Sequence, residues 1–335
     1  MAQSEKKIKP VPGLKETVGK EIVGNAIVMV IIVLCAWGLT FHTWGPAGGI
    51  GTYLGFIACM VPFFTIIQAY VPFINKRAEL GHGKWELKED EAGLPAEPLT
   101  NVWSLILPKA LIYGFGSMLI VVALIKLTGW QPTTLWVVLL VLVIQIVTTT
   151  LLIKEYLPRH LLSFAAAVKE GKKTAPQPLA GYFIVEHVVP FFLLQAYING
   201  CVANRAFHFE LAKAGQSYVP GPALVPDVFI TFVLLALIHW MFSNALTRGD
   251  VRLGRVPAEN LKNLSAWAAL GIIFGAGLVA AVVYGFILKI GGVPGLSVGM
   301  AVIFKMAVIA LSIILGSWIG IRWGGSREYA EMQQG

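Results

Sequence analysis

Charged residues are scarce in this sequence. They occupy 13% of its 335 positions, whereas hydrophobic residues occupy 56%. A soluble domain is about one quarter charged. A soluble core of this size could not hide so much apolar surface from water, so lipid must surround much of the chain. This balance argues against an ordinary soluble globular protein.

Cysteines and catalytic motifs are also scarce. The three cysteines lie in apolar stretches without paired spacing, which argues against a disulfide framework or a zinc site. The chain contains no Walker A motif, no glycine-rich dinucleotide fingerprint, no H-E-x-x-H and no G-x-S-x-G. Paired carboxylates suited to hydrolysis are missing from the apolar stretches. We therefore expect no enzyme active site and, by default, no bound cofactor.

Long apolar stretches are the dominant feature that the sequence does contain. A helix needs about 20 apolar residues to cross the hydrocarbon core of a bilayer. Segments rich in glycine and proline separate several of the stretches. The sequence therefore predicts an all-α integral membrane protein with about eight transmembrane helices. The predicted spans are residues 22–41, 50–74, 103–125, 134–153, 180–203, 224–246, 265–288 and 297–321.

The basic residues predict the orientation of these spans, because cytoplasmic loops are enriched in Lys and Arg. Most of the 26 basic residues lie in the two tails and in the loops near 75–102, 154–179 and 247–264. This distribution predicts that both termini are cytoplasmic and that the chain lies in a cell membrane such as the bacterial inner membrane. It also explains the net charge of +8, so we expect no nucleic-acid partner. The loops on the other side contain only Lys126, Arg205, Lys213 and Lys289.

The two halves of the chain share one layout, with four predicted spans and a long basic loop in the middle. Leu80-Gly81 follows the second span, and Leu253-Gly254 follows the sixth. Because four is an even number, duplicated halves would have the same orientation, as in parallel-repeat transporters. The predicted parts are a cytosolic tail (1–20), a first four-helix half (21–155), a cytosolic linker (156–179), a second four-helix half (180–323) and a cytosolic tail (324–335).

Pairs of glycines spaced four residues apart occur in three of the predicted spans. They are Gly51xxxGly55, Gly271xxxGly275 and Gly316xxxGly320. Small residues at this spacing let two membrane helices approach closely. We therefore predict helix contacts at these positions.

Polar side chains inside the predicted spans mark the candidate site, because such groups are costly in lipid. Glu186 is the only carboxylate well inside a span, and burial would favour its neutral form, which suits proton coupling. Its neighbour His187 lies about 100° further around the helix, so the two cannot both face one ligand squarely. The predicted ligand or proton pathway consists of Glu186, His187, Gln195, Asn199, His239, Asn244 and Lys305.

Lys305 has two interpretations. It lies about one third of the way into the last span, close enough for its side chain to extend to the outer interface. Alternatively, it pairs with a carboxylate or an anionic ligand.

Three functions fit this pattern. The leading interpretation is a secondary transporter or channel-like carrier of a small solute or ion, with proton coupling through the fifth span. The alternative is a membrane subunit of a redox complex, in which His187 and His239 lie at matched depth and bind haem or quinone. The third is a structural subunit of a membrane assembly. The bilayer is the expected partner in each case, and a homo-oligomer or a larger membrane complex is compatible with all three.

Overall fold

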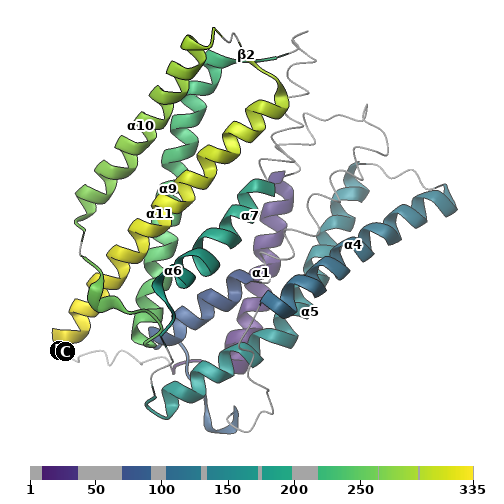
Figure 1. The fold of residues 1–335 in the computed structure, drawn as a ribbon. Helices are drawn as coiled ribbons and strands as arrows, with labels where there is room; N and C mark the ends of the chain where they lie inside the picture. Colours follow the sequence, from purple (N-terminus) through teal and green to yellow (C-terminus); the bar gives the residue numbers. More distant parts are fainter. Residues whose placement is uncertain are drawn as a thin grey trace, which may run out of the picture.

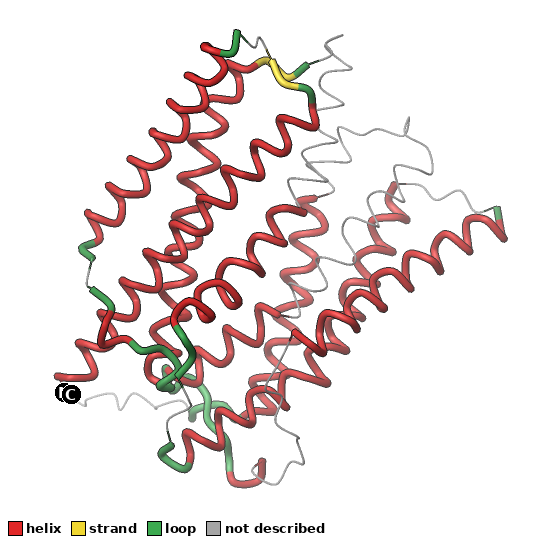
Figure 2. Tube along the Cα trace, viewed as in Figure 1, coloured by secondary structure: helices red, strands yellow, loops and turns green. Residues whose placement is uncertain are grey.

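Helices make up nearly all of the computed structural model (Figures 1 and 2). A two-residue antiparallel pair, β1 (Val219–Pro220) with β2 (Gly295–Leu296), joins the starts of two long helices. The structure describes residues 10–36, 70–91, 103–129, 134–172, 176–197, 218–262, 264–292 and 295–334.

Five of the described helices are long and apolar enough to cross a membrane, so the chain is a multi-pass membrane protein. They correspond to the third, fourth, sixth, seventh and eighth predicted spans. The five helices are α4 (Trp103–Thr128), α5 (Thr134–Lys169), α9 (Gly221–Arg252), α10 (Ala266–Ile290) and α11 (Val298–Gln334).

The other three predicted spans are described in part. The first is covered by α1 (Leu14–Ala36), and the end of the second by a helix at 70–81. The fifth is covered by a continuous helix made of α6 (Leu179–Gly181), η4 (Tyr182–Val188) and α7 (Val189–Tyr197). The remaining residues of these spans, 37–41, 50–69 and 198–203, lie outside the described residues.

Two helices continue well past the ends that the apolar windows predicted. The windows stop at residues 153 and 321, where charged residues begin, but α5 runs to Lys169 and α11 to Gln334. Much of the predicted linker and of the C-terminal tail is therefore helical. The 36 residues of α5 measure about 54 Å, well beyond the roughly 30 Å hydrocarbon core. The extension of α5 stays folded because one face buries Tyr156, Leu157, Leu161 and Ala165.

Figure 1 shows α9, α10 and α11 side by side, with α1, α4 and α5 on the other side of the molecule. The closest contact within the first group is between α9 and α11. A Cβ atom at Gly316 would lie 2.3 Å from the Ala236 carbonyl oxygen, and one at Gly320 would lie 2.6 Å from that of Trp240. The prediction for Gly316xxxGly320 is confirmed.

The two other glycine pairs have different outcomes. A Cβ atom at Gly271 or Gly275 would meet no atom within 4 Å among the described residues, so the predicted contact is not found in the part of the chain that the structure describes. Helix α10 packs on α9 through Gly277 instead, where a Cβ atom would lie 2.7 Å from Val233. The pair Gly51xxxGly55 lies outside the described residues.

The helix at 70–81 connects the two parts of the molecule by crossing α9 at backbone contact. A Cβ atom at Gly81 would lie 2.1 Å from the Gly249 carbonyl oxygen, and one at Gly249 would lie 2.3 Å from that of Ala78. Around this crossing, Phe73 and Ile74 join a buried apolar cluster that includes residues of α1, α5, α9 and α11. The N-terminal and C-terminal parts of the chain therefore share one core.

Both crossing helices end in the same way. The N–H of Gly83 donates to the Leu80 carbonyl (2.9 Å), and that of Lys84 donates to the Glu79 carbonyl (3.0 Å). After α9, Gly254 and Arg255 repeat this pattern with the carbonyls of Val251 and Asp250 (both 2.9 Å). Gly83 and Gly254 have φ of 65° and 78°, the left-handed conformation that terminates many helices at glycine.

The start of α1 is capped by a residue far away in the sequence. Glu91, in the short 3₁₀ turn η3 (Glu89–Glu91), accepts hydrogen bonds from the backbone N–H groups of Leu14 and Lys15, both at 2.8 Å. Burial disfavours the charged carboxylate, but these bonds and one from the Lys88 N–H outweigh it and hold the pKa of Glu91 below its ordinary value of 4.5.

Candidate functional site

Four buried charged side chains meet where the helix at 70–81 crosses α9. They come from the 70–81 helix, from η4, from α9 and from the segment that follows α9. Their side chains are at most 9% exposed, and their formal charges cancel. We call them the charge cluster: Arg77, Glu186, Asp250 and Arg255.

Arg77 forms the strongest link in the charge cluster. Its Nε and Nη2 donate to the two carboxylate oxygens of Asp250, both at 2.8 Å. Its Nη2 also contacts Glu186 Oε2. This two-pronged geometry is typical of the strongest arginine–carboxylate pairs. It connects the first half of the chain to α9 and η4 in the second half.

Arg255 completes the charge cluster from the other side. Its Nη2 donates to Glu186 Oε1 (2.7 Å), and its Nη1 donates to Asp250 Oδ1 (3.2 Å). The Phe164 ring of α5 covers both guanidinium groups, with its centroid 5.7 Å from Cζ of Arg77 and 5.3 Å from Cζ of Arg255. Each carboxylate is thus paired with two guanidinium groups.

Two neutral side chains add hydrogen bonds to the charge cluster. The hydroxyl of Tyr182 donates to Asp250 Oδ2 (2.9 Å) and lies 3.4 Å from Thr247 Oγ1. With its amide nitrogen facing Glu186, Gln177 donates to Oε1 (3.1 Å), and its oxygen accepts from Arg255 Nη2 (2.7 Å). Buried charges are tolerated only when they are paired and hydrogen-bonded in this way.

The backbone at Glu186 is a π-helix, with bonds from residue i to i−5. In an α-helix the N–H of residue 190 would bond to the Glu186 carbonyl, but Pro190 has no N–H. The Val189 N–H bonds to the Ile184 carbonyl, five residues back. Both Glu186 and His187 are buried, but Glu186 faces the charge cluster whereas His187 faces α9. The two side chains thus have different partners among the described residues, and that they cannot both face one ligand stays a prediction. Short π segments occur frequently at functional sites.

The two histidines of the predicted pathway are both buried but have different neighbours. His187 Nδ1 lies 2.9 Å from Ser243 Oγ, and its ring packs edge-on to Tyr182 with centroids 4.7 Å apart. The His239 ring packs edge-on to Phe191, with centroids 4.8 Å apart. Among the described residues, neither ring nitrogen of His239 has a hydrogen-bond partner.

A line of polar side chains on α9 connects these groups. Residues spaced three or four apart share a helix face, and all four members of this line are buried. From the first member to the last, the line extends about 16 Å along α9 at 1.5 Å per residue. We call it the α9 stripe: His239, Ser243, Thr247 and Asp250.

The other predicted site residues lie elsewhere. Lys305 pairs with both carboxylate oxygens of Asp227 at 3.0 Å, near the opposite end of α9, so the carboxylate interpretation is confirmed for it. Asn244 packs against Gly324 of α11, and Gln195 is half-buried on α7. Asn199 lies outside the described residues.

The sequence analysis missed three of the four members of the charge cluster. Arg77, Asp250 and Arg255 follow the apolar windows and were assigned to cytosolic loops, where charges are ordinary. One signal could have identified them. The signal is a pattern that occurs twice: a basic, a small and an acidic residue, followed by a glycine and a second basic residue at the same spacing. The two copies are Arg77-Ala78-Glu79 with Gly83-Lys84 and Arg248-Gly249-Asp250 with Gly254-Arg255.

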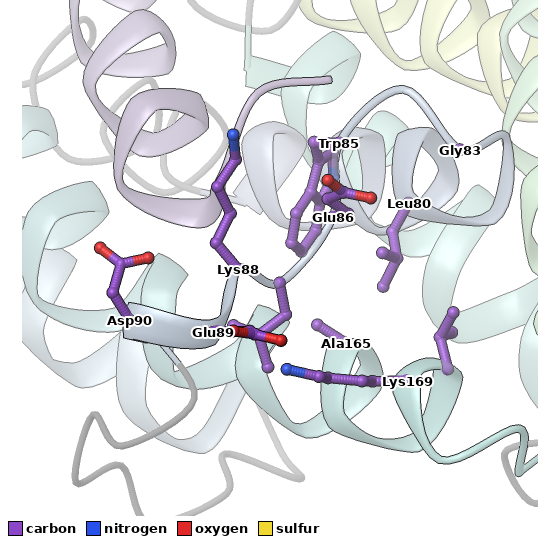
Figure 3. Close-up of a pocket in the computed structure, with 11 residues that line it drawn as sticks. Leu80, Gly83, Trp85, Glu86, Lys88, Glu89, Asp90, Ala165 and Lys169 are labelled. Atoms are coloured by element: carbon purple, nitrogen blue, oxygen red, sulfur yellow. The ribbon is translucent and has the colours of Figure 1, made fainter. Parts of the chain in front are cut away.

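A separate pocket lies between the segment after the 70–81 helix and the end of α5. Its volume is about 730 Å³. In Figure 3, Trp85 and Glu86 line one side and Ala165 and Lys169 the other. The lining mixes acidic, basic and apolar side chains, and it contains none of the predicted site residues.

No protein-family model matches this chain, and comparison with curated proteins and with solved structures gave no match. The membrane assignment therefore rests on the length and composition of the helices. The function must be argued from the charge cluster and the α9 stripe.

Proposed function

We propose that the chain is a secondary transporter or channel-like carrier of a small solute or ion, coupled to protons. The observation that carries this proposal is the α9 stripe, which extends from the charge cluster into the apolar interior. Polar and ionisable groups at this depth are expensive and commonly mark ion or proton pathways.

The chemistry of the stripe suits proton transfer. Tyrosine, threonine, serine and neutral histidine side chains can each donate and accept a hydrogen bond, so a proton can move along them in steps. Tyr182 connects Asp250 to Thr247, and Ser243 connects to His187. His239, with both ring nitrogens free among the described residues, is the innermost acceptor of this pathway.

Glu186 couples proton movement to a change of shape. Its contacts with Arg77 and Arg255 favour the ionised carboxylate, which differs from the neutral form that its apolar sequence context predicted. Protonation of Glu186 would leave two guanidinium groups facing one carboxylate. The link between the 70–81 helix and the second half would weaken, and the two parts could separate.

We further propose that the membrane domain consists of two parallel four-helix halves, 21–155 and 180–323. The two similar helix ends at Gly83 and Gly254 support this division, although they pair Gly254 with Gly83, whereas the Leu-Gly echo in the sequence pairs it with Gly81, two residues earlier. A second echo lies within α5 and α11, where Lys154-Glu155-Tyr156 corresponds to Arg327-Glu328-Tyr329. The two helix ends are 171 residues apart in the sequence, and the two copies of the second echo are 173 residues apart. These nearly equal separations favour duplication over chance.

The orientation with both termini in the cytoplasm, in a membrane such as the bacterial inner membrane, belongs to the same proposal. It rests on the distribution of Lys and Arg. The charge cluster then lies at the cytosolic end of the bundle, and the Asp227–Lys305 pair lies at the outer end.

Electrical recording on a solid-supported membrane tests the transport proposal. Proteoliposomes are exposed to a proton jump alone and then to jumps of alkali cations, inorganic phosphate, amino acids and short carboxylic acids. We expect a pH-dependent current for at least one probe, reduced tenfold or more in Glu186→Gln. Glu155→Gln, in an exposed ion pair with Lys109, is the matched control. Currents no larger than those of protein-free liposomes, or an unchanged Glu186→Gln variant, would contradict the proposal.

A redox subunit is the second candidate, because the ring nitrogens of His239, which have no hydrogen-bond partner in the described part of the chain, could bind a haem or hydrogen-bond a quinone. The visible absorption spectrum and an organic extract of the purified protein test it. A Soret band that His239→Ala abolishes, or a quinone that this variant fails to retain, would favour the redox function. Absence of both would leave the transporter as the better proposal.

A further inference from the structure

An apolar groove lies on the surface formed by α10 and α11. Both helices pack on α9 but contact each other little, which leaves a space of about 770 Å³ between them. Helix α10 contributes Ala276, Ala280 and Val283 to its walls, and α11 contributes Leu311, Leu315 and Trp318. On each helix these residues follow a spacing of three, four and seven, so each wall is one continuous helix face.

The groove is hydrophobic throughout and has the size of a ligand site. The volumes of such sites are roughly 300–1,000 Å³. The alanines of α10 provide the width, and Phe232 of α9 and Phe183 of η4 also line the space. Because both walls belong to spanning helices, the medium outside the groove is hydrocarbon, and an occupant must be apolar along its length.

A cation lies beside one end of the groove. The Arg322 guanidinium is 6.0 Å from the centroid of the Trp318 ring, and no acidic side chain among the described residues forms an ion pair with it. Residues 306–321 contain no charge, and Lys305 and Arg322 are therefore about 25 Å apart along α11 at 1.5 Å per residue. This separation places Arg322 at the edge of the hydrocarbon layer, where lipid headgroups lie.

We propose that this groove binds one anionic phospholipid, with an acyl chain against the walls and the phosphate at Arg322. Arginine is the preferred side chain for phosphate, since its planar guanidinium donates two parallel hydrogen bonds. The occupant combines a long apolar part with a negative charge at one end, and it is available from the surrounding bilayer. The site is separate from the α9 stripe, so it does not depend on transport.

Native mass spectrometry of the full-length protein in a mild detergent tests the site with two probes, phosphatidylglycerol and phosphatidylcholine. We expect the wild-type protein to bind phosphatidylglycerol about tenfold more tightly than phosphatidylcholine, because both lipids carry a phosphate but the choline ammonium of phosphatidylcholine cancels its negative charge and repels Arg322. Arg322→Gln should remove this preference. Ala280→Phe, which fills the groove, should weaken the binding of both lipids.

Two control variants match these changes. Arg159→Gln removes another arginine that lies over an aromatic ring, 5.9 Å from Tyr156, but does not touch the groove. Val282→Phe adds an aromatic ring to an exposed face of α10 outside the groove. Both controls should bind lipid as the wild type does.

Three outcomes would overturn the proposal. They are equal affinity of the wild type for the two lipids, an unchanged preference in Arg322→Gln, and a groove filled by a quinone or by a second copy of the chain. A quinone would be detected by its mass, and a second copy by a dimer that Ala280→Phe dissociates. Arg322 is half-buried and Gln keeps most of its length, so the Arg322→Gln arm tests the proposal independently of Ala280→Phe.

Discussion

At the scale of single residues, α1 depends on an acceptor supplied from outside its own segment. The residues before its first turn are Pro12 and Gly13, and neither has a side chain that can accept a hydrogen bond. Glu91 supplies the carboxylate instead. A Cβ atom at position 13 would lie 2.8 Å from Glu91 Oε2, so glycine is required for the carboxylate to approach.

Replacing this acceptor should destabilise the protein. Glu91→Ala leaves two backbone N–H groups of α1 without their partner, and losing a helix cap costs about 0.5–2 kcal/mol. We expect thermal unfolding in detergent to begin at a lower temperature. Glu89→Ala, in the same turn but at an exposed position, should leave the unfolding temperature unchanged. Equal effects of the two variants would show that Glu91 is not a cap.

The same residue should make stability depend on pH. The pKa of Glu91 in the folded protein lies below its ordinary value of 4.5, so its contribution is complete above pH 4.5 and disappears as the pH falls through the folded-state pKa. The difference in unfolding free energy between wild type and Glu91→Gln should therefore be largest near pH 7 and shrink towards pH 3. A difference that grows on acidification would contradict this assignment.

The charge cluster makes a second prediction at the residue scale. Removing one partner of a buried ion pair leaves a buried charge unpaired, at a cost of about 3–5 kcal/mol. We expect Arg77→Gln and Asp250→Asn each to lower the free energy of unfolding by this amount. The double variant should recover much of the loss, because the charges balance again. Chemical unfolding of the four proteins measures the coupling.

The exposed pair Lys109–Glu155 is the control for this cycle. Its side chains are 36% and 49% exposed, and surface ion pairs contribute about 0–1 kcal/mol. Additive effects of Arg77→Gln and Asp250→Asn, with no recovery in the double variant, would mean that the two residues act independently.

At the scale of helices, apolar length identified the spanning segments but not their ends. A hydropathy window detects contact with lipid, and it therefore stops where charged residues begin. Helix α5 continues past that point because Tyr156, Leu157 and Leu161 are buried against other helices. Such tertiary contacts are not encoded in local composition, and the same limitation hid Arg77, Asp250 and Arg255.

Residues inside the spans were easier to predict than those beyond them. Glu186, His187 and His239 stand out because polar groups are rare in an apolar stretch, and the structure places all three near the charge cluster or on the α9 stripe. Glycine spacing was informative only where two helices actually meet. Gly316 and Gly271 have the same sequence pattern, and of the two only Gly316 faces a neighbour among the described residues.

This contrast between glycines predicts opposite results for one substitution. Gly316→Leu forces α11 away from α9, because its Cβ atom alone would lie 2.3 Å from a backbone oxygen. We expect a loss of about 3 kcal/mol in unfolding free energy, the upper part of the usual range for overpacking. Gly275→Leu on α10 meets no atom among the described residues and should cause no loss. Thermal unfolding in detergent distinguishes the two, and similar losses would contradict the proposed α9–α11 contact.

At the scale of the whole molecule, the orientation can be measured by labelling single cysteines. Cys35, Cys59 and Cys201 are first replaced by serine. Lys172→Cys should then react with a membrane-impermeant maleimide in inside-out vesicles, and Gly291→Cys in intact cells. Both positions are exposed. Labelling of both from the same side of the membrane would contradict the predicted topology.

The contact between Arg77 and its partners has a consequence for biosynthesis. Arg77 emerges from the ribosome 109 residues before Glu186 and 173 residues before Asp250. At a synthesis rate of about 5–20 residues per second, its charge waits roughly 5–20 seconds for the first carboxylate. During that interval, water, lipid phosphate or the insertion machinery must solvate the guanidinium. The first half therefore cannot reach its final packing before the second half has been synthesised. Folding of the second half completes the packing of the first.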